Sequence, residues 1–532
     1  MTHQLHKNDI VDPSCQQLST VDLGNAPVST ILGISDKDAV SLKASLGIKT
    51  IADLANHPVV MKAQAAVAAA ATASTPAQTA FYKLLNKNVQ TSLGASIQGT
   101  FRAANYPTGF SVCTLGATGP ANYNLASLQA LDALLAPDND TLLQFQPQAF
   151  SNYYYQIMLQ GLWKLSTADQ ATINSPDVAQ AQQLVWAATV QDQIPVTVSQ
   201  GWGVLITWVC ATFAPGQPLD NTTLAKAAIG MNLLYPNASL ALTSYVNTMG
   251  PASAIQCAQS SGMLELIATQ LNTKIPTASN GGLQTAADTY YVGYTVPIWA
   301  TLTSGLNNLE NKVSIGCEAN SFTSATTNLT INNSSFSVSP GWFSVTAKGS
   351  SSATNIETYT TAKSTMILNI DYQGITSFGT KVSSIATNLA TGWYDNNILT
   401  QMIKTWNTTA FTGFGLGEST TFAPPQTFGP GKPFGQLNTW VISQPPTVSF
   451  TITDANVTAM AAAFQQGSSY TSIGIFSVSS GSQSSGYTVS NYQASGTTVT
   501  VTISATNVAL LPPTQQTAFV LGGVASYPPN NT

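Results

Sequence analysis

Residues 497–504 read TTVTVTIS, with Val or Ile at every second position and Thr or Ser between them. Because successive side chains of a strand point to opposite faces, this alternation predicts an antiparallel strand with one buried and one solvated face. Related patterns occur upstream in residues 329–331, 335–338, 342–347, 365–372, 447–453 and 473–478. We therefore expect a β-rich, sandwich-like region over residues 300–532, long enough for two subdomains divided near 440–450.

Two short helices are expected to interrupt this region. One spans residues 396–406. The other spans residues 455–466, with Asp454 as its N-cap and Gly467 as its stop signal. A carboxylate at a helix N-terminus satisfies unpaired N–H groups and meets the positive end of the helix dipole. This gives the last charged residue of the chain a local role.

The first half of the chain shows the apolar spacing of helices. The helical segments are residues 36–45, 51–56, 59–73, 79–88, 125–135, 149–165, 175–190, 222–234, 239–248 and 252–271. We predict a tail over residues 1–26, a small module over 27–57, a helical domain over 58–275 and a linker over 276–299. The predicted class is multidomain α+β, with a helical N-terminal half and an antiparallel β-rich C-terminal half that carries short helical insertions.

Residues 31–55 read ILGISDKDAVSLKASLGIKTIADLA, with Gly33 and Gly47 each in a hydrophobic-Gly-Ile turn. This segment resembles the helix-hairpin-helix family, in which such turns join two short helices. The resemblance implies hairpin amides that contact nucleic-acid phosphate in binding members. Here Ser35 and Asp36 follow the first turn and no arginine supports the site. We therefore interpret the segment as a packing or protein-contact module.

Charge is scarce throughout the sequence. The 532 residues include 17 basic and 22 acidic side chains, and residues 455–532 contain no Asp, Glu, Lys, Arg or His. A typical globular surface is about a quarter charged or more, so this surface must consist largely of Ser, Thr, Asn, Gln and apolar groups. Arg102 is the single arginine, which argues against nucleic acid as a partner because affinity there rests on several Lys or Arg contacts. Self-association is the expected consequence.

The residue types that catalysis or metal binding needs are few and scattered. The histidines are His3, His6 and His57, which leaves at most one for a catalytic relay. The glutamates stand singly at Glu265, Glu310, Glu318, Glu357 and Glu418, and the five cysteines form no CxxC or metal-ligand pattern. We predict buried free thiols, no catalytic, cofactor or metal residues, and no enzymatic activity.

Residues 202–214 form the most apolar stretch, WGVLITWVCATFA. It is too short to span a bilayer, which takes about 20 apolar residues. Trp202, Leu205, Ile206 and Trp208 therefore mark either a core segment or a membrane-active one. The second reading supports an alternative function: a pore-forming toxin with a helical insertion domain and a β domain that binds a receptor or glycan.

The leading hypothesis is a non-enzymatic structural or surface-coating protein that forms oligomers, filaments or arrays. Thr498, Thr500 and Thr502 are candidates for an uncharged strand edge that pairs with another copy. A lectin-like binding module on the C-terminal sheets is a third hypothesis. The aromatic clusters that begin at Tyr153, Tyr290 and Trp393 could stack on sugar, but core or sheet packing is the favoured interpretation. Residues 1–15 show no apolar core of a signal peptide, so we expect a cytoplasmic or inclusion-forming protein, or export by a signal-independent route.

Overall fold

The computed structural model describes residues 25–32, 34–55, 75–105, 114–136, 141–164, 166–215, 217, 221–250, 252–253, 256, 282–286, 289–350, 352–384, 392–408, 413–416, 422–476, 478–479 and 486–529. The helix predicted over 59–73 lies outside these ranges, as does most of the helix predicted over 252–271. His3, His6 and His57 also lie outside them.

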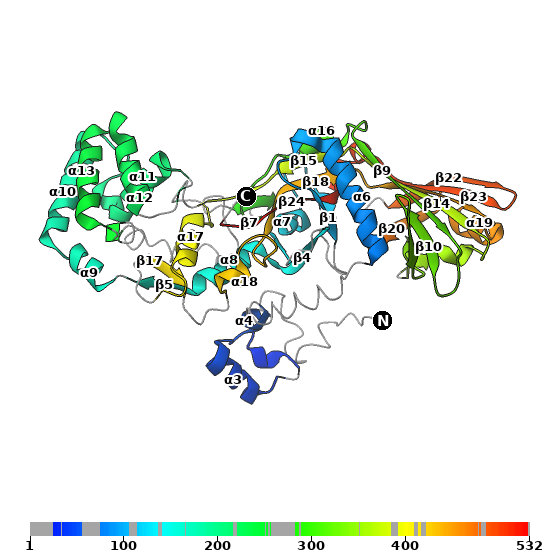
Figure 1. Cartoon of the computed structure of the whole chain (residues 1–532), viewed down its shortest axis with the longest axis horizontal. Helices are drawn as coiled ribbons and strands as arrows, with labels where there is room; N and C mark the ends of the chain where they lie inside the picture. Colours follow the sequence, from blue (N-terminus) through cyan, green and yellow to red (C-terminus); the bar gives the residue numbers. More distant parts are fainter. Residues whose placement is uncertain are drawn as a thin grey trace.

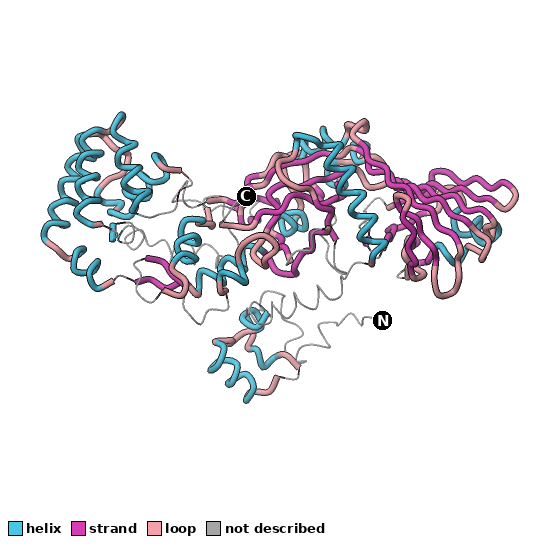
Figure 2. Tube along the Cα trace, viewed as in Figure 1, coloured by secondary structure: helices cyan, strands magenta, loops and turns pink. Residues whose placement is uncertain are grey.

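The molecule is elongated, with a helical lobe at one end and a large antiparallel sheet at the other (Figure 1). A second sheet lies between the lobe and the large sheet. Coloured by secondary structure, the tube shows helices gathered at the left of the view and strands at the centre and right (Figure 2). The arrangement confirms the predicted α+β class, with mostly helices early in the chain and mostly strands later.

The large sheet has the order β11-β10-β9-β14-β19-β23-β22-β20-β12-β13, with β21 paired to β20. Its strands are β9 (Lys312–Asn320), β10 (Thr327–Ile331), β11 (Ser334–Val338), β12 (Phe343–Ala347), β13 (Thr354–Asn355), β14 (Thr365–Gln373), β19 (Thr447–Thr453), β20 (Ser469–Ile475), β21 (Val478–Ser479), β22 (Tyr487–Ser495) and β23 (Thr498–Ala505). Each segment in which we found alternation contributes to this sheet. Along β14 and β19 every second side chain is buried, as the alternation predicts, and β9, which was not predicted, has the same pattern.

The large sheet packs against itself. Phe343 on β12 contacts Phe450 on β19 with ring centroids 5.4 Å apart, although β12 and β19 are not neighbours in the sheet. Phe464 of helix α19 (Val457–Phe464) also contacts Phe450, at 5.5 Å. Two strands that are not neighbours in the sheet therefore face each other across the core. The sheet folds over on itself, which makes the region sandwich-like, as predicted.

The domain predicted as helical over residues 58–275 also contains strands, which belong to a second sheet. Its order is β15-β18-β24-β1-β4-β3, with β2 paired to β24. The strands are β1 (Arg102–Asn105), β2 (Thr114–Gly116), β3 (Ala133–Leu135), β4 (Leu142–Ala149), β15 (Thr376–Gly379), β18 (Gln436–Ser443) and β24 (Thr517–Ser526). Strands from the first third of the chain therefore pair with its last strand, because β1 pairs antiparallel to β24 and parallel to β4.

Two glycines allow β24 to lie between its neighbours. A Cβ atom on Gly522 would come within 2.1 Å of the backbone oxygen of Arg102, and one on Gly523 within 2.1 Å of the backbone oxygen of Thr439. No side chain fits at such distances. The pairing of β24 with β1 on one side and β18 on the other therefore depends on these residues.

The predicted linker over 276–299 also carries structure. It contains β6 (Gly282–Ala286), β7 (Thr289–Val292) and β8 (Tyr294–Thr295), and β8 pairs with β16 (Lys381–Val382). The side chain of Tyr294 is buried, and α16 (Trp299–Leu306) begins directly afterwards. The segment is thus part of the fold and not a free linker.

The helical lobe consists of α10 (Pro176–Gln191), α11 (Trp202–Phe213), α12 (Asn221–Gly230) and α13 (Pro236–Met249), with α9 (Thr167–Ile173) leading into it. Ser175 caps α10, accepting from Val178 N, and Pro176 occupies the first helical position. Two predicted helices are shorter than expected. α7 (Leu125–Leu131) gives way to β3, and α8 (Phe150–Leu159) gives way to β5 (Gly161–Lys164), which pairs with β17 (Gly413–Leu416).

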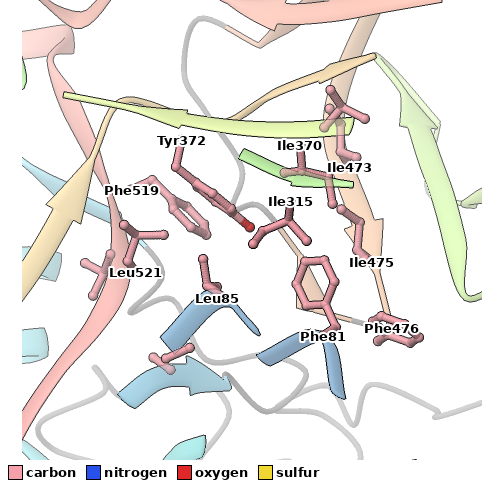
Figure 3. Packing of buried hydrophobic residues seen from close by; sticks show 14 of the residues in the cluster. Phe81, Leu85, Ile315, Ile370, Tyr372, Ile473, Ile475, Phe476, Phe519 and Leu521 are labelled. Atoms are coloured by element: carbon pink, nitrogen blue, oxygen red, sulfur yellow. The ribbon is translucent and has the colours of Figure 1, made fainter. Parts of the chain in front are cut away.

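Helix α6 (Pro76–Leu93) joins the two sheets in one core. Its side chains Phe81 and Leu85 point toward Ile315 of β9 and Tyr372 of β14 (Figure 3). Tyr372 stacks on Phe519 of β24 with ring centroids 6.1 Å apart. A separate core contains the buried residues of the lobe together with α8 and α17 (Asn396–Lys404).

The N-terminal module contains η2 (Val28–Thr30), α3 (Asp36–Leu46) and α4 (Ile51–Ala55). Ser35 and Asp38 form a capping box at the start of α3, and Gly47 ends the helix with φ of 73°. Backbone N–H of Val28 donates to Lys49 O at 3.0 Å, which ties η2 to the turn between the helices.

The predicted cap of α19 is wrong by two residues. Asn456, not Asp454, accepts the hydrogen bond from Ala459 N, at 3.1 Å. Asp454 instead has φ of 49° and accepts from the hydroxyl of Thr497 at 3.3 Å. A turn between β19 and the helix uses the aspartate in the left-handed region, so that the next polar residue becomes the cap.

Candidate functional site

The acidic, histidine and cysteine side chains of the described residues contain no group of three or more that could hold a metal ion. Cys210 and Cys317 are buried thiols outside any disulfide, as predicted for them, and burial raises the pKa of Cys317 to about 12. Glu357 is partly buried and accepts from Gly341 N at 3.0 Å. Burial raises the pKa of this carboxyl above its usual value.

Asp132 is a buried carboxyl with a raised pKa. It is 6% exposed and follows α7. One oxygen accepts from Ser151 N at 3.0 Å and from the Tyr294 hydroxyl at 2.6 Å, and the other accepts from the Ser151 hydroxyl at 2.5 Å. Burial raises its pKa to about 6, and these donors limit the rise. The group links α7, α8 and β8, and its bonded, buried position favours a structural role.

The aromatic residues that we considered for sugar stacking are core residues where the structure describes their side chains. Trp393 lies between Tyr154 and Phe150, at ring distances of 5.9 and 6.3 Å. Tyr153 packs on Phe434 at 5.8 Å. All five rings are buried, so none offers a face to a sugar. The side chain of Tyr290 is outside the described set.

The apolar stretch over 202–214 forms α11, and its predicted core residues are buried. Trp202, Leu205 and Ile206 belong to the core of the lobe, and the indole N–H of Trp202 donates to the Tyr245 hydroxyl at 3.1 Å. Trp208 is partly buried against that core and contacts Tyr235 at 5.9 Å. Of the helices that the structure describes, none has both the length and the apolar character required to cross a membrane.

The predicted edge at Thr498, Thr500 and Thr502 is wrong. β23 is an interior strand with β19 on one side and β22 on the other. The three threonines lie on the outer face of the sheet, where the hydroxyls of Thr451 and Thr500 are 3.0 Å apart. Alternation reports which face of a strand is buried, but it carries no information on whether a neighbour occupies each side.

Exposed apolar side chains are concentrated on the helical lobe. Seven of the 16 large apolar side chains exposed among the described residues are found there: Leu184, Val190, Val198, Ile229, Leu233, Leu234 and Leu240. Leu233 is 91% exposed and Leu240 75%. The apolar spacing did not distinguish these residues from core residues, because six of them lie in segments predicted as helices and Val198 lies between two such segments.

Several of these residues lie at one end of the lobe. Asp192, just after α10, accepts from Ala238 N at 2.7 Å and from the Asn237 amide at 2.6 Å. The C-terminal end of α10 is therefore next to the N-terminal end of α13. We call the exposed set formed by Val190, Leu233, Leu234 and Leu240 the lobe tip. A cavity of about 590 Å³, lined by uncharged residues between Thr189 and Ser199, lies beside Val190.

The lobe tip has little charge around it. Residues 227–264 contain no charged side chain, and residues 178–219 contain only Asp192. The carboxylate of Asp192 is already engaged at the start of α13. An apolar surface with so little charge around it is typical of a contact site.

Comparisons with protein-family models, with curated proteins and with solved structures found no match to this chain.

Proposed function

We propose that this chain is a self-associating structural or surface-coating protein and that the lobe tip makes one of its contacts. The observation that carries this is the cluster of exposed Val190, Leu233, Leu234 and Leu240 on a lobe that is nearly free of charge. Burying apolar surface stabilises a contact by about 25 cal/mol per Å². Apart from Asp192, which is already hydrogen-bonded, no charged residue lies close to these residues in sequence. Forming the contact would therefore not require the desolvation of a nearby charge.

A second copy of the chain fits this surface better than an acidic or basic partner does. Patches that select a charged partner carry complementary charge. Residues 176–249, from the start of α10 to the end of α13, include only four charged residues: Asp177, Asp192, Asp220 and Lys226. Surfaces that bind anionic membranes are rich in Lys and Arg. An uncharged patch can instead pack on the same patch of another copy around a two-fold axis.

The test is sedimentation of the purified chain and of the double variant Leu233→Lys plus Leu240→Lys. The unsubstituted chain should form oligomers whose size changes little between low and high salt, because apolar contacts are not screened by ions. The double variant should lose the largest species, since contact would bury two ammonium groups. Leu510→Lys is the matched control, because Leu510 is 78% exposed but lies after β23, outside the lobe.

Two results would contradict the proposal. A chain that stays monomeric at milligram-per-millilitre concentrations does not self-associate. Assembly that the double variant and the control affect equally does not use the lobe tip. Dye release from neutral liposomes, caused by the unsubstituted chain and lost in the double variant, would instead support the pore-forming alternative.

A further inference from the structure

Strand β11 ends the large sheet. Among the residues that the structure describes, it pairs with β10 alone, from Ile331 opposite Ser334 to Thr327 opposite Val338. The turn between them is Asn332-Asn333, with φ of 48° and 64°. Positive φ at both central residues is the mark of a two-residue type I′ hairpin.

This hairpin determines which backbone groups of β11 face outward. In a two-residue hairpin the residues next to the turn exchange hydrogen bonds, and bonded and non-bonded pairs then alternate along the ladder. Ser334, Phe336 and Val338 therefore bond to β10. The N–H and C=O groups of Ser335 and Ser337 point to the open side of the strand.

β11 has none of the sequence features that usually prevent strand addition at an edge. Natural edges are protected by Lys, Pro, a bulge or a very short strand. The opposite end of the same sheet is β13, which has two residues. β11 has five residues, reads SSFSV, contains no charge or proline, and keeps a continuous register with β10.

We propose that β11 pairs antiparallel with β11 of a second copy of this chain, extending the large sheet across a two-fold axis. This proposal rests on the self-association proposed above and adds a second contact to it. With the axis at Phe336, Ser335 lies opposite Ser337 of the second copy. The outward N–H and C=O groups of one copy then meet those of the other, so that all are satisfied.

The side chains fit the same register. Phe336 is partly buried and packs against the core of the sheets. A two-fold axis perpendicular to the sheet keeps the inner faces of both copies on the same side, so the two Phe336 rings become a cross-strand pair. On the outer face, Ser335 and Ser337 are exposed and uncharged, so neither repels the second copy.

Two self-complementary contacts on one molecule have a consequence for the form of the assembly. A single two-fold contact gives a closed dimer. The lobe lies at one end of the molecule, and β10, the neighbour of β11, lies toward the other end (Figure 1). Alternating lobe-to-lobe and β11-to-β11 contacts therefore produce a linear chain of molecules.

The experiment isolates the edge in the full chain that carries Leu233→Lys and Leu240→Lys. This protein should form a dimer in sedimentation. Adding Ser337→Pro should raise the dimer Kd about tenfold or more, because proline removes an outward N–H from each copy but no bond to β10. Ser337→Ala, which keeps the N–H, should leave the Kd within about twofold.

A second pair of variants uses charge instead of backbone chemistry. Ser335→Lys should weaken the dimer, whereas Thr500→Lys should not, because Thr500 lies on the outer face of interior strand β23. Thermal unfolding of each variant checks that its fold is kept. A monomeric lobe variant, or equal dimerisation by the proline and alanine variants, overturns the edge proposal and leaves association through the lobe intact.

Cross-linking tests the register directly. Ser335→Cys protein mixed with Ser337→Cys protein should form a disulfide dimer on mild oxidation, because these positions are opposite each other when the axis passes through Phe336. Each variant alone, and the unsubstituted chain, should give none above background. Efficient cross-linking of Ser335→Cys protein to itself would overturn the pairing centred on Phe336.

Discussion

Replacing Asp132 with Asn should remove a pH dependence from the stability of this protein. Asp132 is buried among Ser151, Tyr294 and the start of α8, and its pKa in the folded chain is about 6. In the unfolded chain an aspartate has a pKa of about 3.9. The folded state therefore holds the proton more tightly than the unfolded state does.

The sign and size follow from this difference. A carboxyl whose folded pKa is raised favours the folded state most below the unfolded pKa, and that contribution falls as pH rises from about 4 through about 6. At about 1.4 kcal/mol per pH unit, the unfolding free energy should fall by about 3 kcal/mol over this range. Asparagine at position 132 resembles the protonated acid: it can accept at one atom and donate to the Ser151 hydroxyl at the other.

The assay is urea unfolding of both proteins at a series of pH values between 4 and 7. The difference between them isolates Asp132, because contributions from the other titrating groups cancel. We expect near-equal stability at pH 4 and a variant more stable by about 3 kcal/mol at pH 7. Tyr294→Phe removes a donor to the carboxylate and so raises the folded pKa of Asp132 further, which should extend the fall in stability to higher pH. A difference that stays constant across the range would refute the reasoning.

Two further predictions concern the fold. Gly522→Ala should destabilise the protein by about 3 kcal/mol or more, because the new Cβ would lie 2.1 Å from the backbone oxygen of Arg102. Gly496→Ala should destabilise it by only about 1 kcal/mol, because Gly496 has φ of 58° but open space around it. Thermal unfolding ranks the two variants, and equal losses of stability would contradict the close approach at Gly522. Asn456→Ala should lower the free energy of unfolding by about 1 kcal/mol, because α19 loses its N-cap, and Asp454→Ala should lower it by less. If urea unfolding gave the reverse order, Asp454 would be the cap after all.

The sequence by itself determined the α+β class and the positions of most longer elements. Period-two alternation over 365–372, 447–453 and 497–504 identified strands, because each has one face on the core and one in solvent. Helical spacing located α6, α10 and α13, because each of these helices also has one face on the core. The scarcity of charge, which motivates the proposed self-association, is also a property of composition alone.

Tertiary structure alone decided which segments meet. β1 and β4 were not predicted. β1 has only four residues, RAAN, without alternation, and β4 alternates apolar residues with Gln over residues 143–149 but contains Pro147, which is unfavourable in a strand. β1 pairs with β24, which lies hundreds of residues away, and β4 pairs with β1. The exposed position of Leu233 and Leu240 depends on how α12 and α13 pack, and the open side of β11 depends on sheet order. β23 and β11 are both uncharged strands, but β19 and β22 cover β23. Local sequence sets the face that a strand buries, while the neighbours at its edges are set by long-range pairing.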